Sequence, residues 1–196
     1  PFPLDTLLGA WRQIAQGMVH IHARGVVHKD LRADNVVLWQ RRGKGLKATV
    51  VDFGLSEVME GGAVRRPPWK WPSAAPEVVR VGAAGAREAI GAASDVFSFG
   101  YMMLQMVMGR MEPYSLHNLT YDPGLWGAPR EVVVEGWNFP RETSRAPHVV
   151  WQIIEDCTAH DPNARPPFSE VAARLRRATF QLKLRPARRE ALAGGG

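Results

Sequence analysis

The feature that most restricts the fold is a long apolar segment between residues 94 and 109 (SDVFSFGYMMLQMVMG). Its apolar side chains cover nearly every side of a helix instead of one stripe, and such a helix is stable only when other elements surround it. Its methionines are expected to fill core space, because the flexible thioether packs into irregular gaps. The segment therefore predicts a buried central helix.

A second helix is expected near the N-terminus. Apolar residues recur there at spacings of three and four from Leu7 to Ile21, which is the period of one helix face. Asp5 or Thr6 is expected to cap its start, and Gly25 lies near its end, where glycine often follows a helix.

Two short apolar runs, at 36–39 and 47–51, flank a glycine-containing turn at 41–45 and predict a β-hairpin. Residues 52–75 are rich in Gly and Pro and have no clear period. Loops of that length in compact domains are usually functional or disordered. Further helices are expected near residues 129–135, 147–159 and 167–180. The predicted fold class is mainly α (α+β), with one domain and a small two-stranded hairpin.

The composition is that of an ordinary globular domain, with 196 residues, 45% hydrophobic and 22% charged. No apolar run approaches the roughly 18 residues of a membrane span, so no membrane segment is expected. The lone cysteine, Cys157, excludes an intrachain disulfide and favours a reducing, cytoplasmic compartment. Because the chain starts at Pro1 without a methionine, we expect it to be a fragment or a processed product.

The net charge of +6 is concentrated at the C-terminal end. Residues 174–196 hold seven Lys or Arg and one Glu, whereas the rest of the chain holds 18 basic and 18 acidic residues. A basic tail can bind nucleic acid or anionic lipid. The interpretation preferred here is a solvated helix end followed by a disordered tail at 183–196, so no nucleic-acid partner is expected.

Polar residues that suit phosphate chemistry flank the predicted hairpin. Asp30 and Asn35 precede it and Asp52 follows it. A hairpin places its flanking segments side by side, so the three side chains can converge. An Asp with an Asn or Asp suits Mg²⁺, and a further Asp is free to accept a proton. The alternative is a capped turn at Asp30 and Asn35 and an Asx turn at Asp52.

Five motifs in a fixed order resemble those of the protein kinase family, over about residues 4–180. They are H-x-D-L-x-x-x-N at 28–35, D-F-G at 52–54, A-P-E at 75–77, S-D-V-F-S-F-G at 94–100 and D-P-x-x-R-P at 161–166. The resemblance implies a kinase catalytic domain represented by its C-terminal lobe, at 1–182, with an activation segment at 52–77. It also implies ATP and Mg²⁺ as cofactors and a protein substrate.

The resemblance further implies a role for each site residue. Asp30 would be the catalytic base, and Asn35 and Asp52 would hold Mg²⁺, with Asn35 counted among the catalytic residues as well. Arg32 would offset charge on the transferring phosphoryl group. Val37, Asn35 and Asp52 would form the C-lobe side of the nucleotide site.

Five other residues would have structural roles. His28 and Phe53 would stack on each other, and Asp95 would hydrogen-bond the backbone around His28. Glu77 and Arg165 would form a buried ion pair at the end of the activation segment. Breaking one side of such a pair costs roughly 3–5 kcal/mol.

Histidines and the cysteine outside these motifs have simpler interpretations. His20 and His22 have no partner at metal-ligand spacing, so both are expected on the solvent face of their helix. Lys47 is expected to carry its charge into solvent, and Cys157 is expected to be a small buried apolar side chain.

The sequence departs from the family pattern at several points. Lys29 replaces the Arg of H-R-D and so loses the bidentate fork. The activation segment contains Ser56 and Ser73 but no Thr or Tyr, which weakens the case for ordering by phosphorylation. Lys70-Trp71 and Arg32 favour the tyrosine kinase and tyrosine-kinase-like group, but two extra residues before A-P-E leave Ser/Thr against Tyr open.

Two functions follow. The first is the C-terminal lobe of an active kinase that phosphorylates Ser, Thr or Tyr, whose partner is the N-terminal lobe of the parent protein. No G-x-G-x-x-G precedes His28, so the isolated chain is expected to have negligible activity. The alternative is a non-catalytic binding or scaffold module. In either case apolar surface around Val37 and Phe53 is expected to be exposed.

Overall fold

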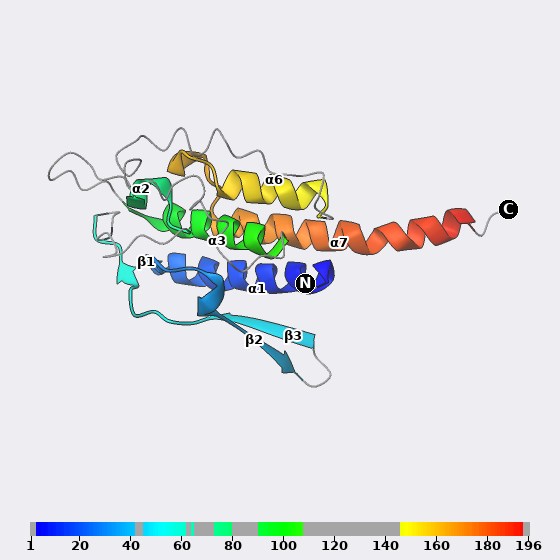
Figure 1. Ribbon diagram of the computed structural model, residues 1–196, viewed down its shortest axis with the longest axis horizontal. Coiled ribbons are helices and arrows are strands. Elements are labelled where there is room, and N and C mark those ends of the chain that lie inside the picture. The colour runs from blue at the N-terminus through cyan, green and yellow to red at the C-terminus, as the bar shows by residue number, and fades with distance from the viewer. Residues whose placement is uncertain are drawn as a thin grey trace, which may run out of the picture.

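Long helices make up most of the described part of the protein. The computed structural model describes residues 3–41, 45–61, 64, 73–79, 90–107 and 146–193, without the side chains of residues 40, 41, 45, 79 and 183–193. The long helices are α1 (Leu4–His22), α3 (Ala92–Val107), α6 (His148–Cys157) and α7 (Phe168–Ala193). α1 lies between the β2–β3 ribbon on one side and α3, α6 and α7 on the other (Figure 1). The fold is mainly helical with few strands, as predicted.

Short elements connect these helices. They are β1 (Val26–Val27), the 3₁₀ turn η1 (Ala33–Asn35), β2 (Val36–Arg41), β3 (Gly45–Val50), β4 (Glu57–Val58), α2 (Pro76–Val79) and the 3₁₀ turn η4 (Pro162–Ala164). The expected helix at 129–135 and the Lys70-Trp71 pair lie outside the described residues.

α3 is the buried central helix that its sequence predicts. Every residue from Ser94 to Leu104 is buried, and α3 packs closely on α6. A Cβ atom built on Gly100 would lie 2.6 Å from Cβ of Cys157 and 2.9 Å from Cγ2 of Thr158. Glycine at position 100 therefore sets how closely these two helices approach.

α1 buries one apolar stripe but begins earlier than expected. Its N-cap residue is Pro3, and no side chain caps the helix. The prediction that Asp5 or Thr6 caps it is therefore wrong, because both lie inside the first turns. An acidic side chain at Asp5 still favours the helix through the partial positive charge of its N-terminus.

The predicted hairpin is present as antiparallel strands β2 and β3, with Val36 opposite Val50. Successive side chains of a strand point to opposite faces. One face of the ribbon packs on α1, while the other exposes Val37 (45%) and Trp39 (47%). The side-chain amide of Gln13 on α1 bonds to β3, with its nitrogen 3.1 Å from the Leu46 carbonyl oxygen.

The segment expected to be irregular contains one small strand. β4 pairs antiparallel with β1, Val27 opposite Glu57. Each strand has only two residues, which is too short to leave a period of two in the sequence, so pattern analysis could not find them.

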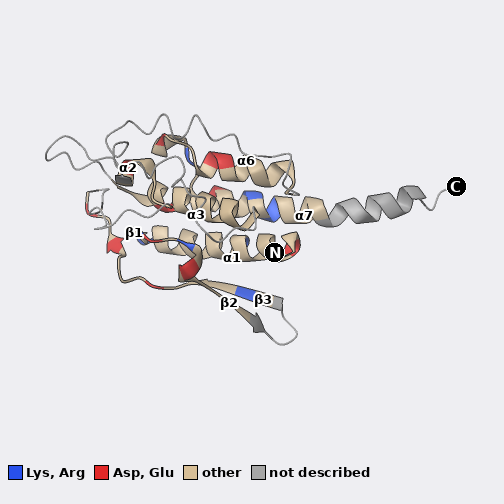
Figure 2. Cartoon of the chain, viewed as in Figure 1, with Lys and Arg blue, Asp and Glu red and all other residues tan. Residues whose placement is uncertain are grey.

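Two further expectations concern the ends and the charge. α7 runs to Ala193, through much of the stretch for which the sequence predicts a disordered tail. Arg, Ala and Leu in that stretch favour a helix, whereas Pro186 opposes it because it lacks a backbone N–H. Lys and Arg of the described part are scattered among Asp and Glu over several elements (Figure 2). None of the helices in the described ranges is both long and apolar enough to cross a membrane.

Candidate active site

The segment from His28 to Asn35 is called the catalytic loop after the role that the resemblance implies, and it is fixed on α3 by one buried carboxylate. Asp95 is 1% exposed, and its two oxygens accept the backbone N–H groups of His28 at 2.8 Å and Lys29 at 2.9 Å. Hydrogen bonds to an ionised acceptor are among the stronger ones in proteins. The start of the loop is thus held to the central helix.

His22 joins the same carboxylate, which the sequence did not predict. Its Nε2 lies 2.9 Å from Oδ2 of Asp95, and its ring contacts Phe168 edge to face at 5.1 Å. The expectation that His22 faces solvent is therefore wrong, whereas His20 is exposed. The partner is 73 residues away in the chain, so no local pattern could reveal the contact.

His28 and Phe53 stack against each other between the loop and the D-F-G segment. Their ring centroids are 5.0 Å apart with the planes at 60°. His28 is fully buried, and its Nε2 lies 3.1 Å from the Val51 carbonyl oxygen. Phe53 is 46% exposed, so one side of this stack is open.

Asp30 and Asn35 are bound to each other across the catalytic loop. Nδ2 of Asn35 donates to Oδ2 of Asp30 at 2.8 Å and to the Asp30 carbonyl oxygen at 2.9 Å. The other carboxylate oxygen, Oδ1 of Asp30, is buried and has no hydrogen-bond partner. A buried acceptor without a donor is costly, so this oxygen is poised to accept a hydrogen bond.

Burial raises the pKa of Asp30 above its ordinary value. The hydrogen bond from Asn35 and the electrostatic effects of Arg32 and His28 oppose that rise, while the negative charge of Asp52 adds to it. The convergence of the side chains of Asp30, Asn35 and Asp52 stays a prediction of the hairpin argument.

Asp52 lies two residues after the end of β3, and a backbone bond holds its neighbour Val51 on Asn35. The Val51 N–H donates to the Asn35 carbonyl oxygen at 2.9 Å. Oδ1 of Asp52 accepts the Gly54 N–H at 3.2 Å, and the side chain is otherwise exposed. The Asx turn considered as the alternative at Asp52 is thus present.

Two residues of this site have left-handed backbone. The φ angles are 69° at Lys29 and 61° at Asp52, and no other non-glycine residue in the described ranges has a positive φ. Such conformations cost of order 1–3 kcal/mol each and cluster at functional sites. Lys29 directly precedes Asp30, and Asp52 carries the other carboxylate, so the fold fixes the direction of both side chains at the expense of backbone strain.

Arg32 and Val37 lie at the edges of the site. Arg32 forms an ion pair with Asp34, whose side chain is 63% exposed. Its positive charge reaches Asp30, because it lowers the pKa of that carboxyl. Val37 is on the exposed face of β2. Lys47, also on an exposed face, lies 5.4 Å from the ring of Trp39.

Lys29 is bound to a residue that the sequence analysis did not single out. Its Nζ lies 2.9 Å from Oε2 of Glu57 on β4, with side-chain exposures of 8% and 21%. The signal available in the sequence was an acidic residue five positions after Asp52, which is too weak alone to name a partner.

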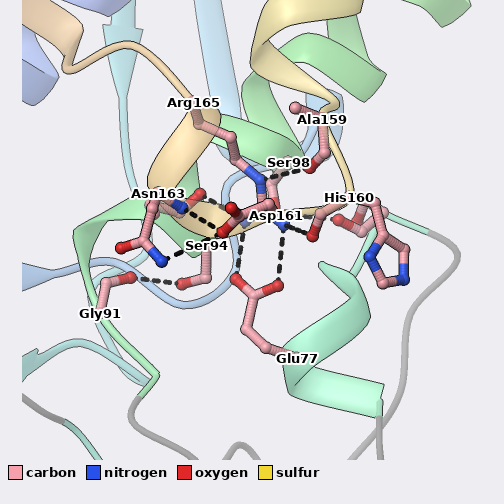
Figure 3. Close-up of polar contacts among 11 residues, drawn as sticks. Glu77, Gly91, Ser94, Ser98, Ala159, His160, Asp161, Asn163 and Arg165 are labelled. Atoms are coloured by element: carbon pink, nitrogen blue, oxygen red, sulfur yellow. Dashed lines mark hydrogen bonds and ion pairs between the residues drawn. The ribbon is translucent and has the colours of Figure 1, made fainter.

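Glu77 and Arg165 form a buried bidentate ion pair (Figure 3). The two guanidinium nitrogens lie 2.7 and 2.8 Å from the two carboxylate oxygens. Arg165 also donates to three backbone carbonyl oxygens, at Ala159, Ala93 and His160. The pair thereby joins α2, the start of α3 and the loop after α6.

The side-chain oxygens of Asn35 and Asp52 fit a hard divalent cation that keeps part of its hydration shell. No group of three or more His, Cys, Asp or Glu able to hold a metal occurs within the described ranges. Asn35 and Asp52 instead offer one amide and one carboxylate from segments joined by the backbone bond between Val51 and Asn35. Mg²⁺ is typically bound by one or two protein oxygens together with waters and substrate phosphates, so these residues fit it.

A model of the family described as protein tyrosine and serine/threonine kinase matches residues 1–175. The chain belongs to the protein kinase family. The resemblance inferred from the five sequence motifs is therefore confirmed.

Named relatives cover most of this kinase chain. Ephrin type-A receptor 8 from Homo sapiens is 32% identical over 187 residues, which are 89% of this chain and 16% of the receptor. Cyclic GMP-binding protein C from Dictyostelium discoideum is 30% identical over 167 residues, or 81% of this chain and 6% of that protein. A probable serine/threonine-protein kinase of the same organism is 28% identical over 182 residues, 89% of this chain and 10% of its own length. The chain thus spans a small part of each of these relatives.

Proposed function

We propose that this chain is the C-terminal lobe of a protein kinase that transfers the γ-phosphate of ATP to a hydroxyl group of a protein substrate. The observation that carries the proposal is the carboxylate of Asp30. One of its oxygens is bound by Asn35, and the other is buried without a partner. A substrate Ser, Thr or Tyr hydroxyl would supply the missing hydrogen bond.

In this proposal Asp30 orients the hydroxyl and accepts its proton as the phosphoryl group transfers. The raised pKa of Asp30 makes the carboxylate a better proton acceptor than an exposed one, because proton transfer is most efficient when the pKa approaches the working pH. Asn35 would have a positioning role as well as a metal-binding role, because its amide nitrogen fixes the rotamer of Asp30.

Asn35 and Asp52 are proposed to hold Mg²⁺ together with ATP. Bound Mg²⁺ would neutralise charge on the phosphates. Arg32 is near enough to alter the pKa of Asp30, so its guanidinium is placed to stabilise negative charge on the transferring group. We assign the outward side chain of Val37 to the surface under the nucleotide base, because it is apolar and exposed beside Asn35.

The proposal requires an N-terminal lobe to complete the nucleotide site. Val37 and the open side of Phe53 are both nearly half exposed, and an apolar surface of this kind fits the second lobe. We therefore propose that the 196-residue chain alone transfers phosphate at a negligible rate. Since Cys157 forms no disulfide, we propose a reducing, ATP-containing compartment, the cytoplasm.

A non-catalytic binding module remains the second candidate, because Lys29 replaces the usual Arg and is occupied by Glu57. The two candidates differ in nucleotide chemistry. A kinase binds ATP in a Mg²⁺-dependent manner through Asp52, whereas a scaffold has no need of that residue.

The test uses the full-length protein that contains this chain. We expect ATP affinity that depends on Mg²⁺, and a loss of that dependence in Asp52→Asn but not in Asp156→Asn, an exposed control on α6. Phosphotransfer to a mixed peptide library should then show whether Ser, Thr or Tyr is the acceptor. Mg²⁺-independent ATP binding with no phosphotransfer would support the binding module instead.

A further inference from the structure

The contact between Lys29 and Glu57 has no part in the proposed chemistry. Both side chains are largely buried, and Nζ of Lys29 lies 2.9 Å from Oε2 of Glu57. A buried ammonium group needs an anionic partner, because removal from water is costly for an unpaired charge. Within this chain that partner is the carboxylate of Glu57.

Both the backbone and the side chain of Lys29 are held by other elements. Its backbone N–H donates to Asp95 on α3 at 2.9 Å, and its φ of 69° is strained. Its side chain reaches β4 through Glu57. Since Lys29 immediately precedes Asp30, the ion pair connects the residue next to the proposed base with the segment that follows Asp52.

The backbone around Glu57 follows the same path. Val27 of β1 lies opposite Glu57 of β4, and the Met59 N–H donates to the Gly25 carbonyl oxygen at 2.7 Å. Oγ of Ser56 is partly buried and lies 3.4 Å from the His28 carbonyl oxygen. Residues 56–59 are therefore held along the catalytic loop and its approach by groups of the chain itself.

A phosphate group would meet unfavourable electrostatics here. To bind Lys29 it would have to displace the carboxylate of Glu57, and the two anions would repel each other. The activation segment, residues 52–77, offers hydroxyl groups only at Ser56 and Ser73. Ser56 is already in contact with the loop, and the backbone carbonyl of Ser73 accepts a bond from Ser98 of α3 at 2.9 Å.

We propose that Glu57 is the built-in counter-ion of Lys29, and that this ion pair docks the start of the activation segment on the catalytic loop without phosphorylation of Ser56 or Ser73. Glu57 is then a positioning residue for Asp30 and Asp52. The effect of this ion pair on catalysis rests on the proposed kinase function, but the docking of the segment can be measured independently of any activity.

The first test measures amide hydrogen exchange in the full-length protein after phosphatase treatment, with the absence of phosphate verified by mass spectrometry. The Met59 amide reports on docking, and the Val51 amide, bonded to Asn35, serves as an internal reference. We expect the Met59 amide of the phosphate-free wild type to be protected. Protection that appears only after phosphorylation would overturn the proposal without any variant being needed.

The second test uses Glu57→Gln, with Glu60→Gln as its matched control, because Glu60 is exposed on the same segment. We expect Met59 exchange to accelerate by about tenfold in Glu57→Gln and to change by less than about twofold in Glu60→Gln, since only the first leaves a buried ammonium unpaired. Wild-type exchange in Glu57→Gln would refute the proposal. If Val51 also loses protection, the charge-retaining Glu57→Asp replaces it, with a smaller acceleration expected at Met59.

The third test measures steady-state kinetics of the phosphate-free protein. A positioning role predicts that Glu57→Gln lowers kcat at an unchanged KM for ATP, and that Lys29→Met combined with Glu57→Gln is no worse than the more damaging single variant. Additive losses would contradict a direct pair. If the wild type itself transfers no phosphate, the proposed function fails, whereas the exchange measurements still decide the docking.

Discussion

Replacing Glu77 by alanine tests the energetics of the buried ion pair that joins α2 to the loop after α6. Arg165 has a side chain that is 0% exposed, and that of Glu77 is 11% exposed. In the Glu77→Ala variant the guanidinium loses its only carboxylate partner within the described residues and stays buried, because its three backbone carbonyl partners hold it in place.

The expected loss follows from the bonds removed. Two charge-assisted hydrogen bonds, at 2.7 and 2.8 Å, contribute roughly 1.5–3 kcal/mol each. The three remaining carbonyl acceptors offset part of that loss, which leaves about 3–5 kcal/mol, the usual cost of breaking one side of a buried pair. At about 2–4 °C per kcal/mol for a chain of this size, Tm should fall by roughly 10 °C. Glu77→Gln keeps one acceptor oxygen, so its Tm should lie between those of the wild type and Glu77→Ala.

The assay is urea unfolding of the 196-residue chain at pH 7, with the free energy of unfolding compared between variants. The matched control is Asp156→Asn. It breaks the Asp156–Arg174 pair, which is as short at 2.6 Å, but the Asp156 side chain is 50% exposed. Exposed pairs contribute about 0–1 kcal/mol. Equal losses in Glu77→Ala and Asp156→Asn would refute the reasoning that burial makes the Glu77 pair costly to break.

Three further predictions concern stability and reactivity. Gly100→Ala should destabilise the chain by about 1–3 kcal/mol in thermal unfolding, because the new methyl group would collide with α6. The control Gly17→Ala, on the open side of α1, should stabilise the chain by about 0.5–1 kcal/mol. A gain in stability in both variants would contradict the close packing of α3 on α6. Asp30→Asn should raise Tm at pH 7, because burial raises the pKa of Asp30 in the folded state. The stability linked to the protonated carboxyl is fully present below the pKa of the unfolded state, and it is lost as the pH rises through the pKa of the folded state. The gain should therefore shrink as the pH is lowered towards 4, near the ordinary value of 3.8, and a gain that grows on acidification would reverse the assigned sign. Burial raises the pKa of Cys157 to about 12, so a thiol reagent at pH 8 should modify it only at the rate of unfolding, and rapid modification of the native chain would show that it is accessible.

Elements with a strong local pattern could be predicted from the sequence. The central helix, the hairpin and α1 each have a long hydrophobic period or an apolar run between turn residues, and all three are present. The start of α1 was missed, since Pro3 precedes the helix where a polar cap was expected. β1 and β4 could not be found, because a strand of two residues is defined by its partner and not by its own sequence.

The candidate site was predictable to the extent that the chain places its residues on either side of one hairpin. Asn35 bonds to Asp30 through its side chain, and its backbone bonds to Val51, the residue before Asp52. Long-range contacts that the family resemblance does not imply were not predictable, such as His22 with Asp95 and Lys29 with Glu57. Each of these pairs combines ordinary residue types, and only the packing of α1, α3 and β4 selects the partners.

The most direct test of the central claim, that the carboxylate of Asp30 accepts the proton of the substrate hydroxyl, is the turnover rate of full-length Asp30→Asn with Mg²⁺ and ATP. Asparagine keeps the shape and the bond to Asn35 but cannot take up a proton. We predict a fall in kcat of at least about a hundredfold, the usual contribution of a general base, with ATP affinity within twofold of wild type. A variant that turns over at the wild-type rate would contradict the account.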